Sequence, residues 1–252
     1  MTSKRATPIR TWYNKLYDAK GAQSMRPPEA YVPLVDLLAP PAGSRLLDVS
    51  CGSGFLLQAA QTRKVRPFGV DLSDEAVRVA RGLPFGVDLS DEAVRVARGV
   101  AAGAGLAVCA GEQLSFRDRA FDALTCLGSL EHFLDMDQGL SEMRRVLQPG
   151  SRCVIMVPNR HFVGWWLMGG GTAQKDVREQ PLALSQWRRL FTKHGFTVLA
   201  VRPDLWHAVK WHYRPARSPL ARIVHGLMGV VWRLIPLGLQ YQFVFLLERG
   251  AA

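Results

Sequence analysis

The segment Leu46-Leu-Asp-Val-Ser-Cys-Gly-Ser-Gly54 decides the fold, because an apolar run ends there in an acid and a glycine turn. Residues 44–49 are typical of a buried strand, and a helix is expected over 55–63. Glycines at 52 and 54 let the backbone approach a ligand where a Cβ would clash. The start of the helix presents free N–H groups. This pattern is typical of α/β folds that bind nucleotides.

A second acid, Asp71, follows Asp48 by 23 residues and ends the next expected strand. A carboxylate there can accept hydrogen bonds from both hydroxyls of a ribose. The dinucleotide fingerprint would need glycine at position 57, where the chain has Leu57. Asp48 would also repel a pyrophosphate on the turn, but it suits a cation such as an amino-acid ammonium group. We therefore predict a nucleoside cofactor.

Strands alternate with helices along the rest of the chain, which predicts a mostly parallel sheet with helices on both faces. Ligands of such sheets bind at the carboxyl ends of the strands. The other expected strands are 67–71, 106–110, 121–126, 152–157, 197–201 and 242–247, with helices at 31–38, 136–147 and 184–193 and a turn at Pro149-Gly150.

A tandem duplication occupies residues 67–99. Residues 67–82 read PFGVDLSDEAVRVARG, and residues 84–99 repeat the same sixteen letters. Only one copy can fill the second strand position of the sheet, so either Asp71 or Asp88 could be the ribose ligand. We favour Asp71, because the first helix then needs no long insertion before the second strand.

Composition is that of an ordinary globular protein, with 252 residues and 48% hydrophobic side chains. It excludes collagen-like, low-complexity and disulfide-scaffold classes. The four cysteines have no metal-ligand spacing, so no metal site is expected, and they suit a reducing cytoplasm. The N-terminus lacks the apolar core of a secretory signal, which also favours a cytoplasmic protein.

The formal net charge of +11 is concentrated at the two ends of the chain. Residues 1–26 carry six Lys or Arg and one Asp, and residues 203–252 carry six Lys or Arg and two acids. Residues 203–239 form a basic, aromatic insertion before the last expected strand. This composition suits peripheral contact with an anionic membrane, capture of a lipid-like acceptor, or a solvated cap over the sheet edge. It could also grip RNA, but no RNA-binding module is recognisable, so nucleic acid is not the expected partner.

Four ordered motifs resemble the class I S-adenosylmethionine-dependent methyltransferases. They are the glycine turn, Gly69-Val-Asp71, Phe121-Asp-Ala-Leu-Thr-Cys-Leu-Gly-Ser-Leu-Glu-His-Phe133 and Glu142-Met-Arg-Arg-Val-Leu-Gln-Pro-Gly150. Together they are similar to the methyltransferase type 11 branch, which includes quinone and lipid methyltransferases. The resemblance covers 45–201 and 242–247. It implies a Rossmann-like, doubly wound, seven-stranded sheet, mostly parallel with an antiparallel last strand.

The resemblance also implies roles for individual residues, with S-adenosylmethionine as the cofactor. Asp48 would lie near the methionine ammonium, and Asp71 would bind the ribose. Backbone around the cofactor would come from Ser50, Gly52 and Gly54, the adenine region from Gly111 and Glu112, and the methionine side from Leu127. Two positions depart from the family pattern: Ser50 stands where the loop has its first glycine, and Ala110 stands where strand three has its acid.

His132 lies just beyond the fourth expected strand, where a general base could deprotonate an acceptor, although a structural histidine fits equally well. Methyl transfer depends mainly on proximity and orientation, so a base is optional. We expect residues 1–42 to form a helical lid and 43–252 the methyltransferase domain, which would act on a small, apolar or lipid-like acceptor. A non-catalytic binding protein with the same fold is the main alternative, and an RNA methyltransferase is the weaker one.

Overall fold

The computed structural model describes residues 3–20, 26–73, 75, 77, 105–167, 179–210 and 218–251. They contain one seven-stranded sheet with the strand order β3-β2-β1-β4-β5-β7-β6. β7 is antiparallel to both of its neighbours, whereas the other pairings are parallel. The expected fold is therefore confirmed. The strands are β1 (Arg45–Val49), β2 (Arg66–Asp71), β3 (Gly105–Val108), β4 (Phe121–Leu127), β5 (Leu147–Pro158), β6 (Phe196–Pro203) and β7 (Gln242–Arg249).

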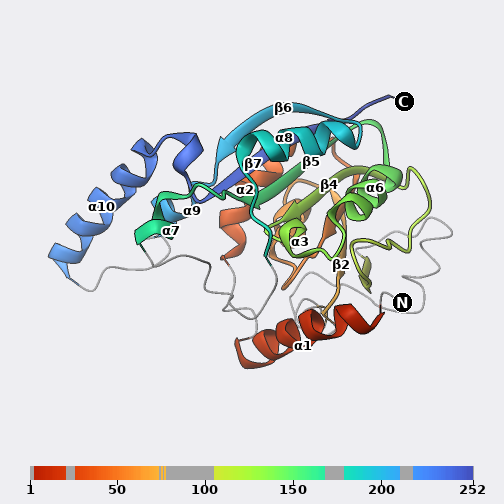
Figure 1. Cartoon of the computed structure of the whole chain (residues 1–252), viewed down its shortest axis with the longest axis horizontal. Coiled ribbons are helices and arrows are strands. Elements are labelled where there is room, and N and C mark those ends of the chain that lie inside the picture. Colours follow the sequence, from red (N-terminus) through yellow and green to blue (C-terminus); the bar gives the residue numbers. More distant parts are fainter. Residues whose placement is uncertain are drawn as a thin grey trace.

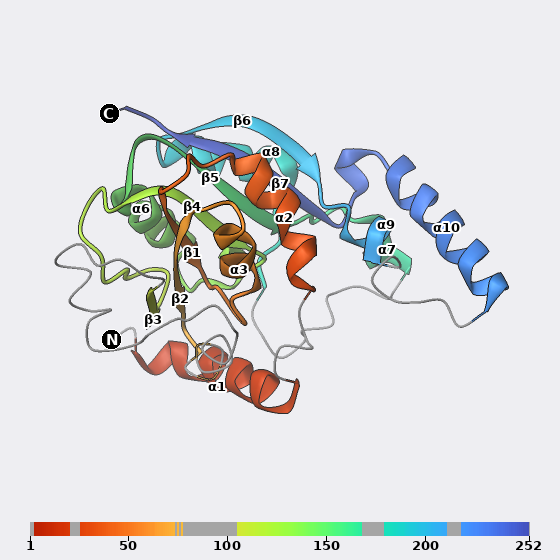
Figure 2. The same cartoon turned by 180° about the vertical axis from the view of Figure 1, so that it is seen from behind.

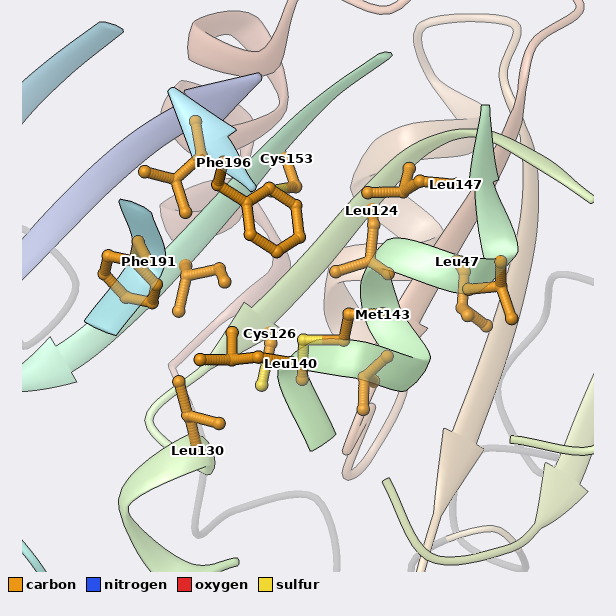
Figure 3. Close-up of a cluster of buried hydrophobic side chains, with 14 of the residues drawn as sticks. Leu47, Leu124, Cys126, Leu130, Leu140, Met143, Leu147, Cys153, Phe191 and Phe196 are labelled. Carbon is orange, nitrogen blue, oxygen red and sulfur yellow. The ribbon is translucent and has the colours of Figure 1, made fainter. Parts of the chain in front are cut away.

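Helices cover both faces of the sheet (Figure 1). On one face lie α6 (Met136–Val146) and α8 (Leu184–Lys193), and their apolar side chains join the larger buried cluster. Figure 3 shows this cluster, in which Leu140 and Met143 of α6 face strand residues such as Leu124. On the other face lie α2 (Val32–Leu38), which follows a short 3-10 turn η2 (Pro28–Tyr31), and α3 (Phe55–Gln61) (Figure 2).

Alternation along β1 assigns its side chains to the two faces of the sheet. Leu47 and Val49 belong to the cluster under α6 and α8, whereas Leu46 packs with residues of α2 and α3. Successive side chains of a strand point to opposite faces. Asp48 therefore shares the face of Leu46, and this placement decides what its carboxylate can reach.

The expected turn at Pro149-Gly150 lies inside β5 rather than between two elements. β5 starts at Leu147, which pairs with Phe121, and the pairing resumes at Arg152 opposite Ala123. Residues 148–151 of β5 thus face one residue of β4. Gly150 has a φ of 75°, which turns the extra residues out of the ladder while the strand continues on both sides.

The N-terminal helix α1 (Ser3–Lys20) lies along the edge at which β1 and β2 end (Figure 2). The Ser73 hydroxyl, just after β2, donates to Asn14 Oδ1 of this helix at 2.6 Å. At another end of the molecule lie α7 (Val163–Leu167), α9 (Trp206–Val209) and α10 (Pro219–Leu234), and α10 projects from the body (Figure 1). Residues 78–104, including the second copy of the duplication and Asp88, lie outside the described residues.

Candidate active site

The turn after β1 adopts a left-handed backbone at three positions. The φ angles are 61° at Ser50, 52° at Gly52 and 77° at Gly54. Glycine adopts this conformation without a Cβ penalty, whereas Ser50 carries a side chain there at a cost of about 1 kcal/mol. The amide of Cys51 donates to the Val70 carbonyl at 2.9 Å, which fixes the turn against the end of β2.

Asp71 at the end of β2 organises this turn. Its Oδ2 accepts from the Gly52 amide at 2.9 Å, and its Oδ1 accepts from the Ser73 amide at 2.8 Å. Each carboxylate oxygen can accept a second hydrogen bond, so both oxygens retain capacity for a ligand. Burial raises the pKa of Asp71 to about 6, although the amides oppose this shift.

Asp48 is buried below the turn. Its Oδ1 accepts from the Thr125 hydroxyl of β4 at 2.7 Å, and burial raises its pKa to about 7. Asp48 lies on the sheet face of α2 and α3, and it does not line the cavity at the carboxyl edge of the sheet. Its expected place beside an ammonium group stays a prediction. Gly52 and Gly54 also do not line the cavity and shape the turn through their backbone.

A cavity of about 880 Å³ lies at the carboxyl edge of the sheet and brings most of the predicted residues together. Known ligand pockets occupy roughly 300–1,000 Å³, so this cavity has room for a nucleoside and a second small molecule. The predicted residues that line it are Ser50, Asp71, Gly111, Glu112, Leu127 and His132.

Residues 111 and 112 shape the wall that was expected around the adenine. A Cβ on Gly111 would overlap the ring of Phe133, so only glycine fits at this position. Glu112 Oε1 accepts from the Leu134 amide at 2.8 Å, which ties the loop after β3 to the loop after β4. Ala110 also lines the cavity, so the missing acid leaves an apolar patch.

His132 comes from the short 3-10 helix η3 (Leu130–His132), and its side chain is largely buried at the cavity wall. Its ring meets the edge of Tyr13 from α1, with the ring centroids 6.3 Å apart. Burial raises the pKa of the neighbouring Glu131 to about 8. This segment therefore combines a histidine with a buried carboxyl group.

An ion pair that sequence reasoning missed also lines the cavity region. Arg26 donates to both carboxylate oxygens of Asp204, at 2.9 and 2.6 Å, and its guanidinium lies 5.3 Å from the Trp206 ring centroid. The pair joins the segment before η2 to the end of β6. The two residues are 178 positions apart, and no sequence signal pairs charges over such a separation.

Aromatic side chains from α1, α9 and the start of β7 form the rest of the wall. They include Tyr13, Tyr17, Trp206, His207 and Tyr241. Burial lowers the pKa of His207 to about 4, so its ring is neutral at physiological pH. In the loop after β5, His161 is exposed, and Trp165 packs on Phe162 and Tyr241 without lining the cavity. The side chain of Trp166 lies outside the described residues.

The donor and acceptor groups at this edge fit S-adenosylmethionine. Asp71 offers two acceptors for the ribose hydroxyls, and the small residues Ala110 and Gly111 line the cavity where the adenine was expected. Leu127 and Ser50 line the same cavity, where the methionine portion would lie. The described residues contain no cluster of His, Cys, Asp and Glu arranged to hold a metal ion.

Comparison with known proteins gives one family and several relatives. A family model described as a methyltransferase domain matches residues 23–201. The chain is 26% identical over 185 residues to the ubiquinone biosynthesis O-methyltransferase of Xylella fastidiosa, which covers 66% of this chain and 68% of that protein. It is 29% identical over 147 residues to the protein of the same name from Idiomarina loihiensis, over 58% of this chain and 55% of that one.

A human protein called probable tRNA methyltransferase 9B is 32% identical over 128 residues. This match covers 48% of the chain but only 24% of the human protein. The chain therefore spans between about a quarter and two thirds of the length of these relatives.

Solved structures agree with the fold. A putative methyltransferase of Haloferax volcanii, in complex with the Trm112 methyltransferase activator, has a TM-score of 0.57 at 17% identity, over 98% of this chain and 97% of that one. Phosphoethanolamine N-methyltransferase 2 of Haemonchus contortus, with S-adenosyl-L-methionine, has a TM-score of 0.59 at 19% identity, over 88% and 52%. At these identities the likeness shows the fold alone.

The family model matches most of the chain, and the turn, the acid at the end of β2 and the sheet order occupy the places that the motifs predicted. The chain belongs to the class I methyltransferases that use S-adenosylmethionine.

Proposed function

We propose that the protein transfers a methyl group from S-adenosylmethionine to a small acceptor with an apolar or lipid-like body. The observation that carries this proposal is that the wall of one cavity combines two kinds of residue. It includes cofactor-binding positions such as Asp71, and it also includes aromatic side chains such as Trp206 and Tyr241. Its volume exceeds what one nucleoside needs, and its aromatic part suits an apolar guest.

The proposed role of the cofactor-binding residues is to fix the position of the methyl donor. The bound cofactor supplies a methyl group on a positively charged sulfur, which is transferred by in-line displacement. Asp71 would hold the ribose through its two oxygens, and Ser50 and Leu127 would line the methionine portion. Such positioning is the main source of rate acceleration in a displacement between two bound molecules.

His132 is the proposed general base. Its ring lies in the cavity wall, where it could accept a proton from an acceptor hydroxyl or amine as the new bond to carbon forms. General-base catalysis contributes roughly 10²–10⁴-fold to a rate. His132→Gln should therefore lower kcat by about 100-fold or more and leave the affinity for the cofactor unchanged.

The relatives support an oxygen acceptor in a lipid-like molecule. Two of them are named ubiquinone biosynthesis O-methyltransferases. The similarity to a probable tRNA methyltransferase covers only 24% of that protein, and the described cavity is lined by few basic groups, with Arg26 already paired to Asp204. A small-molecule acceptor therefore fits the chain better than RNA.

The test is a methyl-transfer assay with deuterated S-adenosylmethionine and two probes, a phenol with a short aliphatic tail and the matching aliphatic amine. The expected result is a methylated phenol, detected by mass spectrometry, that His132→Gln forms far more slowly. Calorimetric titration with the cofactor separates the alternatives. No cofactor binding would refute the proposal, and binding without transfer to either probe or to RNA would favour a non-catalytic protein.

A further inference from the structure

The outer side of α10 is an unusually apolar surface. Its exposed fractions reach 70% at Leu220, 69% at Ile223, 63% at Leu227 and 75% at Leu234. Met228 and three valines of the same helix, at positions 224, 230 and 231, are also exposed. At the ordinary helical repeat, these eight side chains cover an arc of about 160°. Contiguous apolar surface of this kind marks an interaction site.

The opposite side of α10 is fixed to the body of the domain. Gly229 lies against the carbonyl of Ala208 in α9, where a Cβ would come within 2.9 Å of the oxygen. Trp232 stacks on His207 and on Phe162, with ring centroids 4.8 and 5.8 Å apart. Gln240 donates to the carbonyls at the end of the helix. These contacts keep the apolar arc turned outward.

The charged residues of the sequence segment that contains α10 have one sign. The sequence contains no Asp or Glu between Asp204 and Glu248, whereas the same stretch contains Lys210, Arg214, Arg217, Arg222 and Arg233. Helical spacing places Arg222 and Arg233 on the side opposite the apolar arc. An apolar arc with a cationic polar side is typical of helices that lie in the interface of an anionic membrane.

The length of α10 agrees with a position along the membrane surface. Its 16 residues span about 24 Å, which is less than the hydrocarbon core of roughly 30 Å. Among the residues that the structure describes, no helix is long and apolar enough to cross a bilayer.

We propose that α10 lies flat in the headgroup region of an anionic bilayer, with its apolar arc among the acyl chains. A second copy of the chain is a poorer occupant, because two such surfaces would bring two cationic segments together without acids. The proposal rests on the proposed function, since it names the source of the acceptor. His207 contacts Trp232 of α10 and also lines the cavity, so a lipid-like acceptor would reach the cavity beside the bilayer.

Vesicle flotation with the full-length protein tests this proposal. The probes are vesicles of phosphatidylcholine alone and vesicles that also contain phosphatidylglycerol. The double variant Ile223→Glu with Leu227→Glu places two charges in the apolar arc. The matched control is Leu199→Glu, because Leu199 is 42% exposed on β6, away from α10. The wild type and the control should float with the anionic vesicles, whereas the double variant should lose binding by at least about 100-fold.

Three results would overturn the proposal: no flotation of the wild type, equal loss in the Leu199 control, or a wild-type dimer that the double variant dissociates without any vesicle binding. Cofactor titration keeps the proposed function separate. If the double variant binds S-adenosylmethionine and methylates a soluble phenol normally but has lost a vesicle-embedded phenol, the membrane proposal is supported. If the wild type floats but methylates neither phenol, the proposed function fails and the membrane site stands.

Discussion

Replacing Asp71 with alanine should weaken binding of the cofactor by about 100-fold or more. Each Asp71 oxygen already accepts one amide, from Gly52 or Ser73, and has capacity for one further bond. Two bonds to the ribose hydroxyls would then be lost. Hydrogen bonds to charged groups contribute roughly 1.5–3 kcal/mol each, so two account for at least about 3 kcal/mol. A change of about 1.4 kcal/mol is tenfold in affinity.

The duplication provides a matched control, because Asp88 stands in the same sixteen-residue sequence as Asp71. Calorimetric titration of Asp71→Ala, Asp88→Ala and wild type with S-adenosylhomocysteine gives the three dissociation constants. Asp88→Ala should bind like the wild type, and Asp71→Asn, which keeps one acceptor, should lose about tenfold. Thermal unfolding of each variant checks that the turn is intact. Normal affinity in Asp71→Ala together with a large loss in Asp88→Ala would refute the assignment.

Three further substitutions test the stability of the site, each by urea unfolding. Ser50→Gly should raise the free energy of unfolding by about 1 kcal/mol, because it removes a Cβ at a φ of 61°. A decrease in this free energy would contradict the backbone strain at Ser50. Asp48 has its pKa raised by burial from 3.8 to about 7, so the folded state binds a proton that the unfolded state has released. The free energy of unfolding of the wild type therefore falls as pH rises from about 4 to about 7. Between about pH 5 and pH 8 the wild type should lose roughly 2–3 kcal/mol that Asp48→Asn retains. Parallel pH profiles of the two proteins would show that Asp48 is not the cause. Arg26→Ala removes the cation that pairs with the buried Asp204 and should lower the free energy of unfolding by about 3 kcal/mol. The double variant Arg26→Ala with Asp204→Ala should recover part of this loss. Additive losses in the double variant would argue against the pair.

The parts of the fold that could be predicted are those with a local cause. Alternating strands and helices predict the sheet, and the glycine turn after β1 predicts where a ligand approaches, because both follow from neighbouring residues. The strand over 121–126 and the helix over 136–147 were expected within one residue of β4 and α6. The turn at Pro149-Gly150 was expected before a strand, but it lies within β5 as a bulge, where pairing with β4 stops after Leu147 and resumes at Arg152.

The site was predictable only where a motif spans it. Asp71 and the residues after β3 and β4 line the cavity as expected, since each ends or follows a parallel strand. The aromatic wall and the Arg26–Asp204 pair depend on contacts between distant segments. The alternation along β1 places Asp48 on the face of Leu46, which packs with residues of α2 and α3, and its expected role beside an ammonium group stays a prediction.

The excess positive charge lies in the two ends of the chain, outside the segments that carry the family motifs. The family motifs lie in the core, whose charge is nearly balanced, whereas the basic segments supply α1, α9 and α10. α1 and α9 contribute Tyr13 and Trp206 to the cavity, and α9 carries α10. Under the two proposals, selection of the acceptor and attachment to a surface would be encoded in the same segments. A change in these segments would then alter the acceptor without touching the cofactor turn, because function resides in sites that are added to a shared fold.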